Sequence, residues 1–209
     1  MKDAGSAREQ LDGIAPVAPE VWWRLQAYAG HLQHWQKTLN LVAPSTLLHI
    51  WQRHILDSWQ LVPLIPGDGG DIADLGSGAG FPGMVLAISG IKQVHLVESN
   101  HRKAAFLRFV AEQTETACQV HAVRAETLSR PEIGEVSVIT ARALASLTAL
   151  LELSLPLCGP DSRLIFPKGR RWQDEVREAE QMYHFDFTAH ESVTDPEAVI
   201  LELRHLTKR

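Results

Sequence analysis

Apolar residues in the first third of the chain recur at alternating steps of three and four, which is the spacing of one face of a helix. The first set predicts an amphipathic helix that carries Leu25, Tyr28, Leu32, Trp35 and Leu39. A second set follows Ser45, a residue type that caps helix N-termini, and contains Leu48, Trp51, Ile55 and Val62. The pattern therefore predicts two amphipathic helices.

From residue 71 onward, short apolar runs alternate with helical segments. The runs cover 72–75, 93–97, 119–123, 136–140 and 163–166. The helical segments lie near 82–89, 100–114, 144–155 and 171–182. This alternation predicts an α/β fold with a mostly parallel sheet covered on both faces. Residues 183–190 and 199–206 have the pattern of two more strands, and the short link between them predicts an antiparallel pair at the sheet edge.

The only candidate linker runs from Pro63 to Gly70. It separates an N-terminal helical extension, residues 19–66, from the sheet domain, residues 67–209, and we expect residues 1–18 to form a flexible N-terminus. A chain of 209 residues, 45% of them hydrophobic, is long enough for one well-buried domain with an accessory element of this kind.

Several protein classes are disfavoured by the composition. The first ten residues contain no apolar core, so we expect no signal peptide. The most apolar stretch, 143–158, is interrupted by Glu152 and Pro156 and is shorter than the about 20 residues that cross a bilayer. Cys118 and Cys158 are isolated, which suggests neither a disulfide framework nor a thiolate metal site. We expect a cytoplasmic protein, monomeric, with no membrane contact and no metal.

A glycine loop follows the first apolar run of the sheet domain. Gly76, Gly78 and Gly80 can take positive φ and let a ligand lie against backbone N–H groups, and Pro82 suits the start of the next helix. Glu98 ends the following run, roughly twenty residues downstream, where an acid can accept both ribose hydroxyls of an adenosine. The two features together predict a site for a nucleotide-shaped ligand.

The spacing of the loop distinguishes between ligands. A dinucleotide loop has the pattern G-x-G-x-x-G, whereas this chain has G-x-G-x-G preceded by Asp74. The carboxylate of Asp74 would repel a pyrophosphate but can accept a hydrogen bond from an ammonium group. S-adenosylmethionine, which has an ammonium group and no phosphate, fits better than NAD. A methyltransferase for RNA, one for small molecules or proteins, and an NAD-binding oxidoreductase or non-catalytic nucleotide-binding domain all remain open.

A nucleic-acid partner receives weaker support. The formal net charge of −5 and a pI near 6.0 argue against a broad basic surface. Tryptophans of the N-terminal third offer a base-stacking platform, but their helical spacing favours the core. Basic residues do cluster in loops expected on the cofactor side of the sheet, at Arg124, Arg142, Lys168, Arg170 and Arg171.

Six boxes carry a resemblance to a known family. In order they are R-H-I-L-D-S at 53–58, the loop at 74–83, Glu98-Ser99 with the helix that follows, R-A-E at 124–126, R-A-L-A-S at 142–146, and Lys168-Gly169. The chain resembles the bacterial glucose-inhibited division protein B family, the 16S ribosomal RNA guanine-N7 methyltransferases, over about residues 20–206. The resemblance implies a class I S-adenosylmethionine-dependent methyltransferase fold, Rossmann-like, with a seven-stranded, mostly parallel sheet, an antiparallel edge strand and an N-terminal helical extension.

The resemblance also implies site residues and a partner, which is 16S rRNA in the small subunit or its precursor. The residues implied for binding S-adenosylmethionine and its product S-adenosylhomocysteine are Asp74, Gly76, Ser77, Gly78, Gly80, Phe81, Glu98, Ala125, Glu126 and Arg142. Those implied for RNA are Arg53, His54, Arg124, Arg142, Lys168, Arg170 and Arg171. Two departures are that Ala141 replaces a serine before Arg142, and that Ala198 replaces an arginine after Glu197.

The chemistry of guanine N7 requires little acid–base catalysis. N7 has a lone pair and no proton, so its attack on a sulfonium methyl group needs alignment rather than a general base. A cation at N7 would oppose the positive charge that develops on the purine. We therefore expect Arg142, the catalytic candidate, to bind guanine O6, a phosphate or the cofactor carboxylate. The alternative is a structural arginine that pairs with Glu126 or Glu98.

Overall fold

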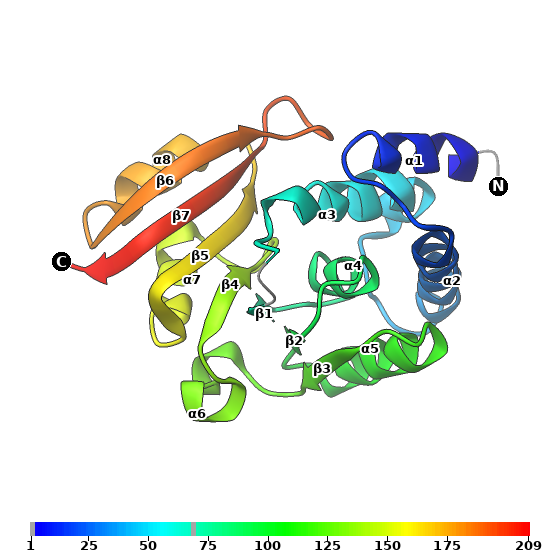
Figure 1. Cartoon of the computed structure of the whole chain (residues 1–209), viewed down its shortest axis with the longest axis horizontal. Helices are drawn as coiled ribbons and strands as arrows, with labels where there is room; N and C mark the ends of the chain where they lie inside the picture. Colours follow the sequence, from blue (N-terminus) through cyan, green and yellow to red (C-terminus); the bar gives the residue numbers. More distant parts are fainter. Residues whose placement is uncertain (1–2, 68–69) are drawn as a thin grey trace.

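The computed structural model describes residues 3–67 and 70–209. Its centre is a seven-stranded sheet in the order β3-β2-β1-β4-β5-β7-β6 (Figure 1). The strands are β1 Asp71–Leu75, β2 Val94–Val97, β3 Cys118–His121, β4 Val136–Thr140, β5 Cys158–Lys168, β6 Tyr183–Glu191 and β7 Val199–Lys208. β1 to β5 pair parallel, whereas β7 pairs antiparallel with both β5 and β6. The expected mostly parallel sheet with an antiparallel last strand is confirmed, and β7 lies one position inside the edge strand β6.

Helices cover both faces of the sheet (Figure 1). They are α1 Asp3–Asp12, α2 Pro19–Trp35, α3 Asp57–Trp59, α4 Gly83–Ile88, α5 His101–Gln113, α6 Arg130–Ile133, α7 Leu147–Ser154 and α8 Trp172–Ala179. Neighbouring strand residues point to opposite faces, so Ile72 belongs to the core under α2, α4 and α5, and Ala73 to the core under α7 and α8. The described part of the helical extension shares its core with the sheet, because Leu25 and Tyr28 pack in the same cluster as Ile72.

The second amphipathic helix is not the regular one that we expected. Residues 44–64 form a 3₁₀ turn η1 (Pro44–His49), a π-helical segment η2 (Trp51–Leu56), α3 and a further turn η3 (Val62–Leu64). Ser45 lies inside η1 rather than at an N-cap, and Leu48 is 82% exposed. The wide turns of η2 bury His54, Ile55 and Leu56 together, which a period of 3.6 residues does not predict.

The N-terminal segment also differs from its expectation. Residues 3–12, within the range expected to be flexible, form α1, which packs on η2 through buried Ala7 and Leu11. Val17 is buried too, and its N–H donates to Asp12 Oδ1 at 2.7 Å. Among the described residues, no helix combines the length and apolarity needed to cross a membrane.

Candidate active site

The glycine loop leaves the carboxyl end of β1 in the conformation that its sequence predicts. Gly76 and Gly78 have φ of +66° and +58°, a region that other residues rarely adopt. The hydroxyl of Tyr28 in α2 donates to the carbonyl oxygen of Ala79 at 2.6 Å. The loop is therefore held from the helical extension as well as from the sheet.

Glu98 closes the other side of the loop at the end of β2. Its Oε2 accepts from Gly78 N–H at 2.8 Å and its Oε1 accepts from Asn100 N–H at 2.7 Å. A carboxylate has about four lone-pair positions, so each oxygen keeps one for a ligand. Glu98 thus both fixes the loop and faces the cavity beside it.

That cavity has a volume of about 370 Å³, within the range of small-molecule sites. It is lined by Leu41, Val42, His54, Gly76, Ser77, Gly78, Ala79, Phe81, Glu98, Ser99, Lys103, Arg142, Ala143 and Leu144. We call it the donor cavity. Six of the ten residues expected at the cofactor site line it, whereas the other four do not: Asp74, Gly80, Ala125 and Glu126.

Asp74 does not point into the donor cavity, contrary to our expectation of a bond to a ligand ammonium group. Its side chain is completely buried, and its carboxyl oxygens accept from Gly83 N–H at 3.1 Å and from the Thr140 hydroxyl at 2.8 Å. Burial raises the pKa of Asp74 to about 6, although these hydrogen bonds and the charge of Arg142 lower it in part. Asp74 fastens α4 and β4 to β1 instead.

Ala125 and Glu126, which the family resemblance implies beside an adenine, lie outside the residues that line the donor cavity. Ala125 packs against the core on the α7 side, because residues 125–127 form a 3₁₀ turn, η4, beyond the end of β3. Glu126 is exposed and pairs with Arg124 at 3.1 Å. Neither residue is part of the donor cavity in the described chain.

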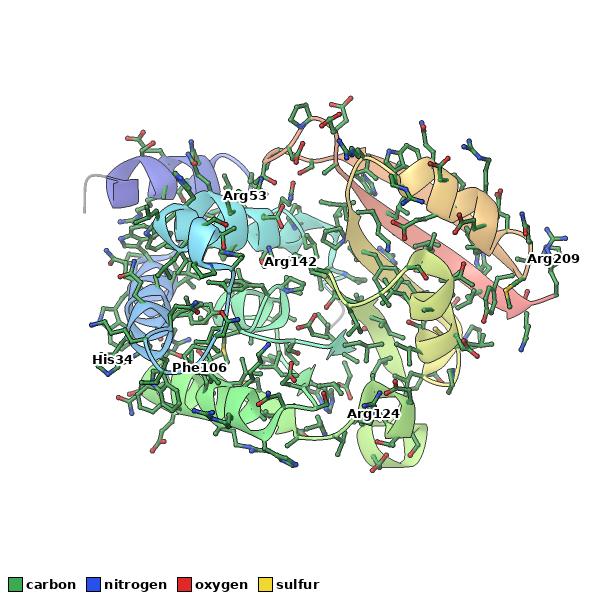
Figure 2. The ribbon with its side chains drawn as sticks, turned by 180° about the vertical axis from the view of Figure 1, so that it is seen from behind. His34, Arg53, Phe106, Arg124, Arg142 and Arg209 are labelled. Carbon is green, nitrogen blue, oxygen red and sulfur yellow. The ribbon has the colours of Figure 1, made fainter. Side chains whose placement is uncertain are left out.

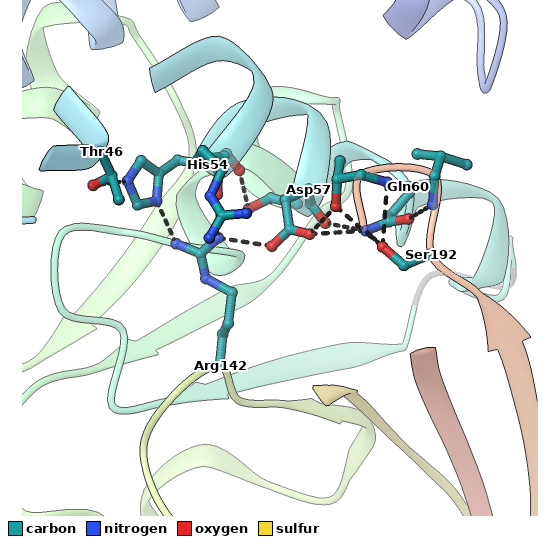
Figure 3. A network of polar contacts seen from close by, with 10 residues as sticks. Thr46, His54, Asp57, Gln60, Arg142 and Ser192 are labelled. Carbon is teal, nitrogen blue, oxygen red and sulfur yellow. Dashed lines mark hydrogen bonds and ion pairs between the residues drawn. The ribbon is translucent and has the colours of Figure 1, made fainter. Parts of the chain in front are cut away.

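Arg142 follows β4 and is the centre of a polar network (Figure 3). Its Nη1 donates to Asp57 Oδ2 at 2.8 Å and to the carbonyl oxygen of Arg53 at 3.1 Å, and its guanidinium lies over the Phe81 ring at 5.1 Å. The structural alternative for Arg142 named Glu126 or Glu98 as its partner, and the partner is Asp57 instead.

His54 completes the hold on Arg142. Its Nδ1 is 2.8 Å from Arg142 Nη2, and its Nε2 is 2.8 Å from the Thr46 hydroxyl. Because a guanidinium only donates, Nδ1 must accept and the ring is neutral with its proton on Nε2. Burial, with the nearby charge of Arg142, lowers the pKa of His54 to about 4, which agrees with this assignment. His54 was expected to contact RNA, but both of its nitrogens are used internally.

A second cavity, of about 460 Å³, lies on the other side of Arg142. The ends of β4 and β5, the R-H-I-L-D-S segment and the 192–198 segment between β6 and β7 surround it. We call it the acceptor cavity. His54, Arg142 and Ala143 line both cavities, so these three residues form the wall between them.

The basic candidates for RNA contact fall into three groups. Arg53, Arg170 and Arg171 are exposed, and Arg53 lines the acceptor cavity beside Arg142 (Figure 2). Arg124 is exposed but lies apart from Arg53 and Arg142 in the same view. Lys168 is 8% exposed, and its ammonium group donates to Glu175 Oε2 at 2.6 Å and to the carbonyl oxygen of Ala145 at 3.1 Å. Lys168 lines the acceptor cavity, but its ammonium group is already paired within the chain.

Four residues of the site were missed by sequence reasoning. Tyr28 was assigned only to a helix face, and Asp57 was quoted as part of a box without a role. Gln60 and Thr194 gave no signal, because their contacts join segments more than a hundred residues apart. The tyrosine in this apolar stripe was a clue, since a buried hydroxyl needs a hydrogen-bond partner.

The parallel sheet, the glycine loop at β1 and the acid at the end of β2 define a class I S-adenosylmethionine-dependent methyltransferase fold. Solved structures support the fold. A ribosomal protein L11 methylase from Lactobacillus delbrueckii subsp. bulgaricus matches with a TM-score of 0.56 at 15% identity, over 72% of this chain and 77% of that one. A TehB-like SAM-dependent methyltransferase from Corynebacterium glutamicum matches with a TM-score of 0.56 at 17% identity, over 85% and 97%.

Sequence comparison gives the family. The profile of the rRNA small subunit methyltransferase G family, GidB, matches residues 23–206, and the chain belongs to this family. A relative named ribosomal RNA small subunit methyltransferase G in Rhodospirillum centenum is 45% identical over 98% of this chain and 88% of its own length. Another of the same name, in Rhizobium meliloti, is 43% identical over 98% of both chains. The resemblance found in the six boxes is confirmed.

Proposed function

We propose that this protein transfers a methyl group from S-adenosylmethionine to N7 of a guanine in 16S ribosomal RNA. The observation that carries the proposal is the pair of cavities that share Arg142, His54 and Ala143 as one wall. They open at the carboxyl ends of parallel strands, where α/β sheets bind ligands. A donor on one side of this wall and a base on the other would meet beside Arg142.

The residues of the donor cavity fit S-adenosylmethionine. Leu41, Val42 and Leu144 offer apolar contacts, and Glu98 keeps lone pairs for ribose hydroxyls. The bound cofactor supplies an electrophilic methyl group on a sulfonium, so that a carbon–nitrogen bond to N7 forms as the carbon–sulfur bond breaks and its electron pair stays on sulfur.

The chain's own residues hold and align the reactants. Three of the five N–H groups of Arg142 donate to Arg53, Asp57 and His54, so the guanidinium is fixed and offers its remaining donors to guanine O6 or a phosphate. Guanine N7 carries no proton, so no residue needs to act as a base. Arg53, Arg170 and Arg171 are exposed cations near the acceptor cavity and suit an RNA backbone.

Base geometry favours an unpaired target. The major groove of A-form RNA is deep and narrow and hides N7, and the acceptor cavity of about 460 Å³ can receive one base turned out of its stack. We propose that a single chain acts on the small subunit or its precursor.

The experiment that tests this function maps N7-methylguanine in 16S rRNA by borohydride reduction and aniline cleavage. Small subunits from cells that lack this protein are incubated with the purified chain and S-adenosylmethionine. We expect new cleavage at one guanine with the parent chain, and strongly reduced cleavage with Arg142→Ala. Methylation elsewhere, or of ribosomal protein alone, would contradict the proposal, and titration with NADH in calorimetry tests the alternative cofactor.

A further inference from the structure

Asp57 enters the function proposed above only as one of three acceptors for Arg142, and Thr194 does not enter it, although both residues line the acceptor cavity. Asp57 begins α3, and Thr194 belongs to the 192–198 segment. The Thr194 hydroxyl donates to Asp57 Oδ1 at 2.6 Å, while Asp57 Oδ2 accepts from Arg142 at 2.8 Å. Three distant parts of the chain thus meet at one carboxylate.

The 192–198 segment is fastened beside the same carboxylate by a second route. The Gln60 side-chain amide donates to Asp57 Oδ1 at 3.0 Å, and its carbonyl oxygen accepts from Val193 N–H at 2.9 Å (Figure 3). Oδ1 therefore receives two donors, which leaves Oδ2 for Arg142. The side chains of Arg142 and Asp57 are only 17% and 19% exposed, so water screens their attraction less than at the surface.

The charge of this pair matters for the proposed reaction. Methylation at N7 makes the purine ring positive, and an unpaired guanidinium in the cavity wall would repel that charge. The Asp57 carboxylate, in contact with the guanidinium, brings the formal charge of the pair to zero. Arg142 can then position the base through hydrogen bonds without an uncompensated charge beside the developing cation.

We propose that Asp57 is a positioning residue for methyl transfer: oriented by Thr194, it holds Arg142 in the wall between the two cavities and offsets its positive charge. The proposal rests on the proposed function. It implies that the 192–198 segment must be seated on α3 before the wall is complete, so this segment acts on the reaction through Asp57.

The test compares single-turnover methyl transfer to small ribosomal subunits at saturating S-adenosylmethionine. Asp57→Asn should slow transfer about tenfold or more, because misplaced groups lose rate steeply, yet bind the subunits as tightly as the parent or more tightly, since one negative charge is gone. Thr194→Val should slow transfer several-fold, and Thr194→Ser should restore most of the rate. Thr188→Val, on the exposed face of β6, is the matched control and should transfer at the parent rate.

Coupling distinguishes action through Asp57 from a separate effect of Thr194. The double variant Asp57→Asn with Thr194→Val should be no slower than Asp57→Asn alone, because neighbours in one network are not additive. Additive losses, or a parent rate in Asp57→Asn, overturn the proposal. If Asp57→Asn does not fold, the rates of methyl transfer by Thr194→Val and Thr194→Ser decide the proposal. A slow Thr194→Val with a near-parent Thr194→Ser supports it, and equal rates overturn it. A parent chain that forms no N7-methylguanine overturns the proposed function, whereas an active parent with unaffected variants overturns only this inference.

Discussion

At the scale of single residues, Asp74 shows how the fold uses a buried carboxyl group. Its oxygens accept from Gly83 in α4 and from Thr140 in β4, and so join three elements below the glycine loop. Burial raises its pKa from 3.8 to about 6. At neutral pH the carboxyl group is therefore ionised, and the burial of its charge lowers the free energy of unfolding. The hydrogen bonds to Gly83 and Thr140 offset part of this loss.

This raised pKa predicts a defined pH dependence. Between pH 4 and 6 the folded protein holds a proton on Asp74 that the unfolded chain has lost, so the free energy of unfolding falls as pH rises through this range. The fall from this group amounts to about 3 kcal/mol by pH 7. Chemical denaturation from pH 4 to pH 8 should show that Asp74→Asn gains stability relative to the parent by this amount. Asp161→Asn, at an exposed position, controls for the change in net charge. A constant difference between Asp74→Asn and the parent would contradict the assignment.

His54 is the second buried titratable group whose state matters. Its pKa of about 4 means that it stays neutral throughout the physiological range and keeps accepting from Arg142. The Arg142 network therefore does not depend on a histidine that changes charge near neutral pH.

At the scale of elements, α2 of the helical extension supports the loop that lines the donor cavity. Tyr28 is completely buried between α2, α4 and α5, and its ring is 5.3 Å from that of Phe81. Its hydroxyl holds the carbonyl oxygen of Ala79, one residue past Gly78. The extension thus limits the movement of the loop that lines the donor cavity.

Tyr28→Phe isolates this contact, because it removes the hydroxyl and keeps the ring. A buried carbonyl left without its donor costs about 1–3 kcal/mol, so we expect the free energy of unfolding to fall by about that amount. We also expect the dissociation constant for S-adenosylmethionine, measured by calorimetry, to rise several-fold as the loop loosens. Equal affinity in parent and variant would show that the sheet alone fixes the loop.

Lys168 joins β5 to α8 and to the start of α7. Its ammonium group pairs with Glu175, which also accepts from Leu147 N–H at 2.7 Å. We expect Lys168→Met to lower the free energy of unfolding by about 2 kcal/mol, because the half-buried Glu175 loses its positively charged partner. The affinity for small subunits, measured by filter binding, should stay within about twofold of the parent. A large loss of RNA affinity without a loss of stability would restore the phosphate contact that the sequence suggested.

The elements that sequence predicted well are those with strong local patterns. The strands and α2, α4, α5, α7 and α8 follow from runs of apolar residues and from the alternation of strand and helix. The irregular segment 44–64 was not predicted, because its helical turns change type three times. Contacts with α1 and with Arg142, and not a single apolar helix face, determine which of its residues are buried. Its 3₁₀ and π turns have no fixed period to detect.

The candidate site was predictable in its loops and much less so in its pairings. The positive φ of Gly76 and Gly78 and the place of Glu98 follow from local sequence. The partners of Arg142 and Lys168 cannot be predicted from local sequence. Each partner lies in another segment, and the sequence contains many other acids that could pair with these cations. Asp74 illustrates the same difficulty: an acid beside a ligand loop can equally face inward and hold a helix.

At the scale of the whole molecule, the formal charge of −5 limits how the protein can bind RNA. Arg53 lines the acceptor cavity, and the exposed Arg170 and Arg171 directly follow Gly169, which lines it too, so these cations belong to one cavity rather than to a long groove. We therefore expect recognition by shape, with few phosphate contacts.

This charge distribution predicts a shallow salt dependence. Each phosphate contact with single-stranded RNA contributes about −0.7 to the slope of log affinity against log salt, so three arginines give a slope of about −2. Arg171→Ala should reduce the magnitude of the slope by about 0.7 and leave the maximal rate unchanged. Filter binding over a salt series measures both. Arg124→Ala, which changes a cation elsewhere on the surface, is the control and should leave the slope unaltered, whereas an equal loss with Arg124→Ala would favour a wider footprint.

The bond between Thr194 and Asp57 spans 137 residues, and that between Arg142 and Asp57 spans 85. As a ribosome synthesises the chain, the R-H-I-L-D-S segment emerges early and must wait for both partners. The partition between donor and acceptor is consequently among the last features to form during synthesis. A nascent chain that has emerged as far as Leu144 holds every residue that lines the donor cavity, whereas Asp57 still waits for Thr194.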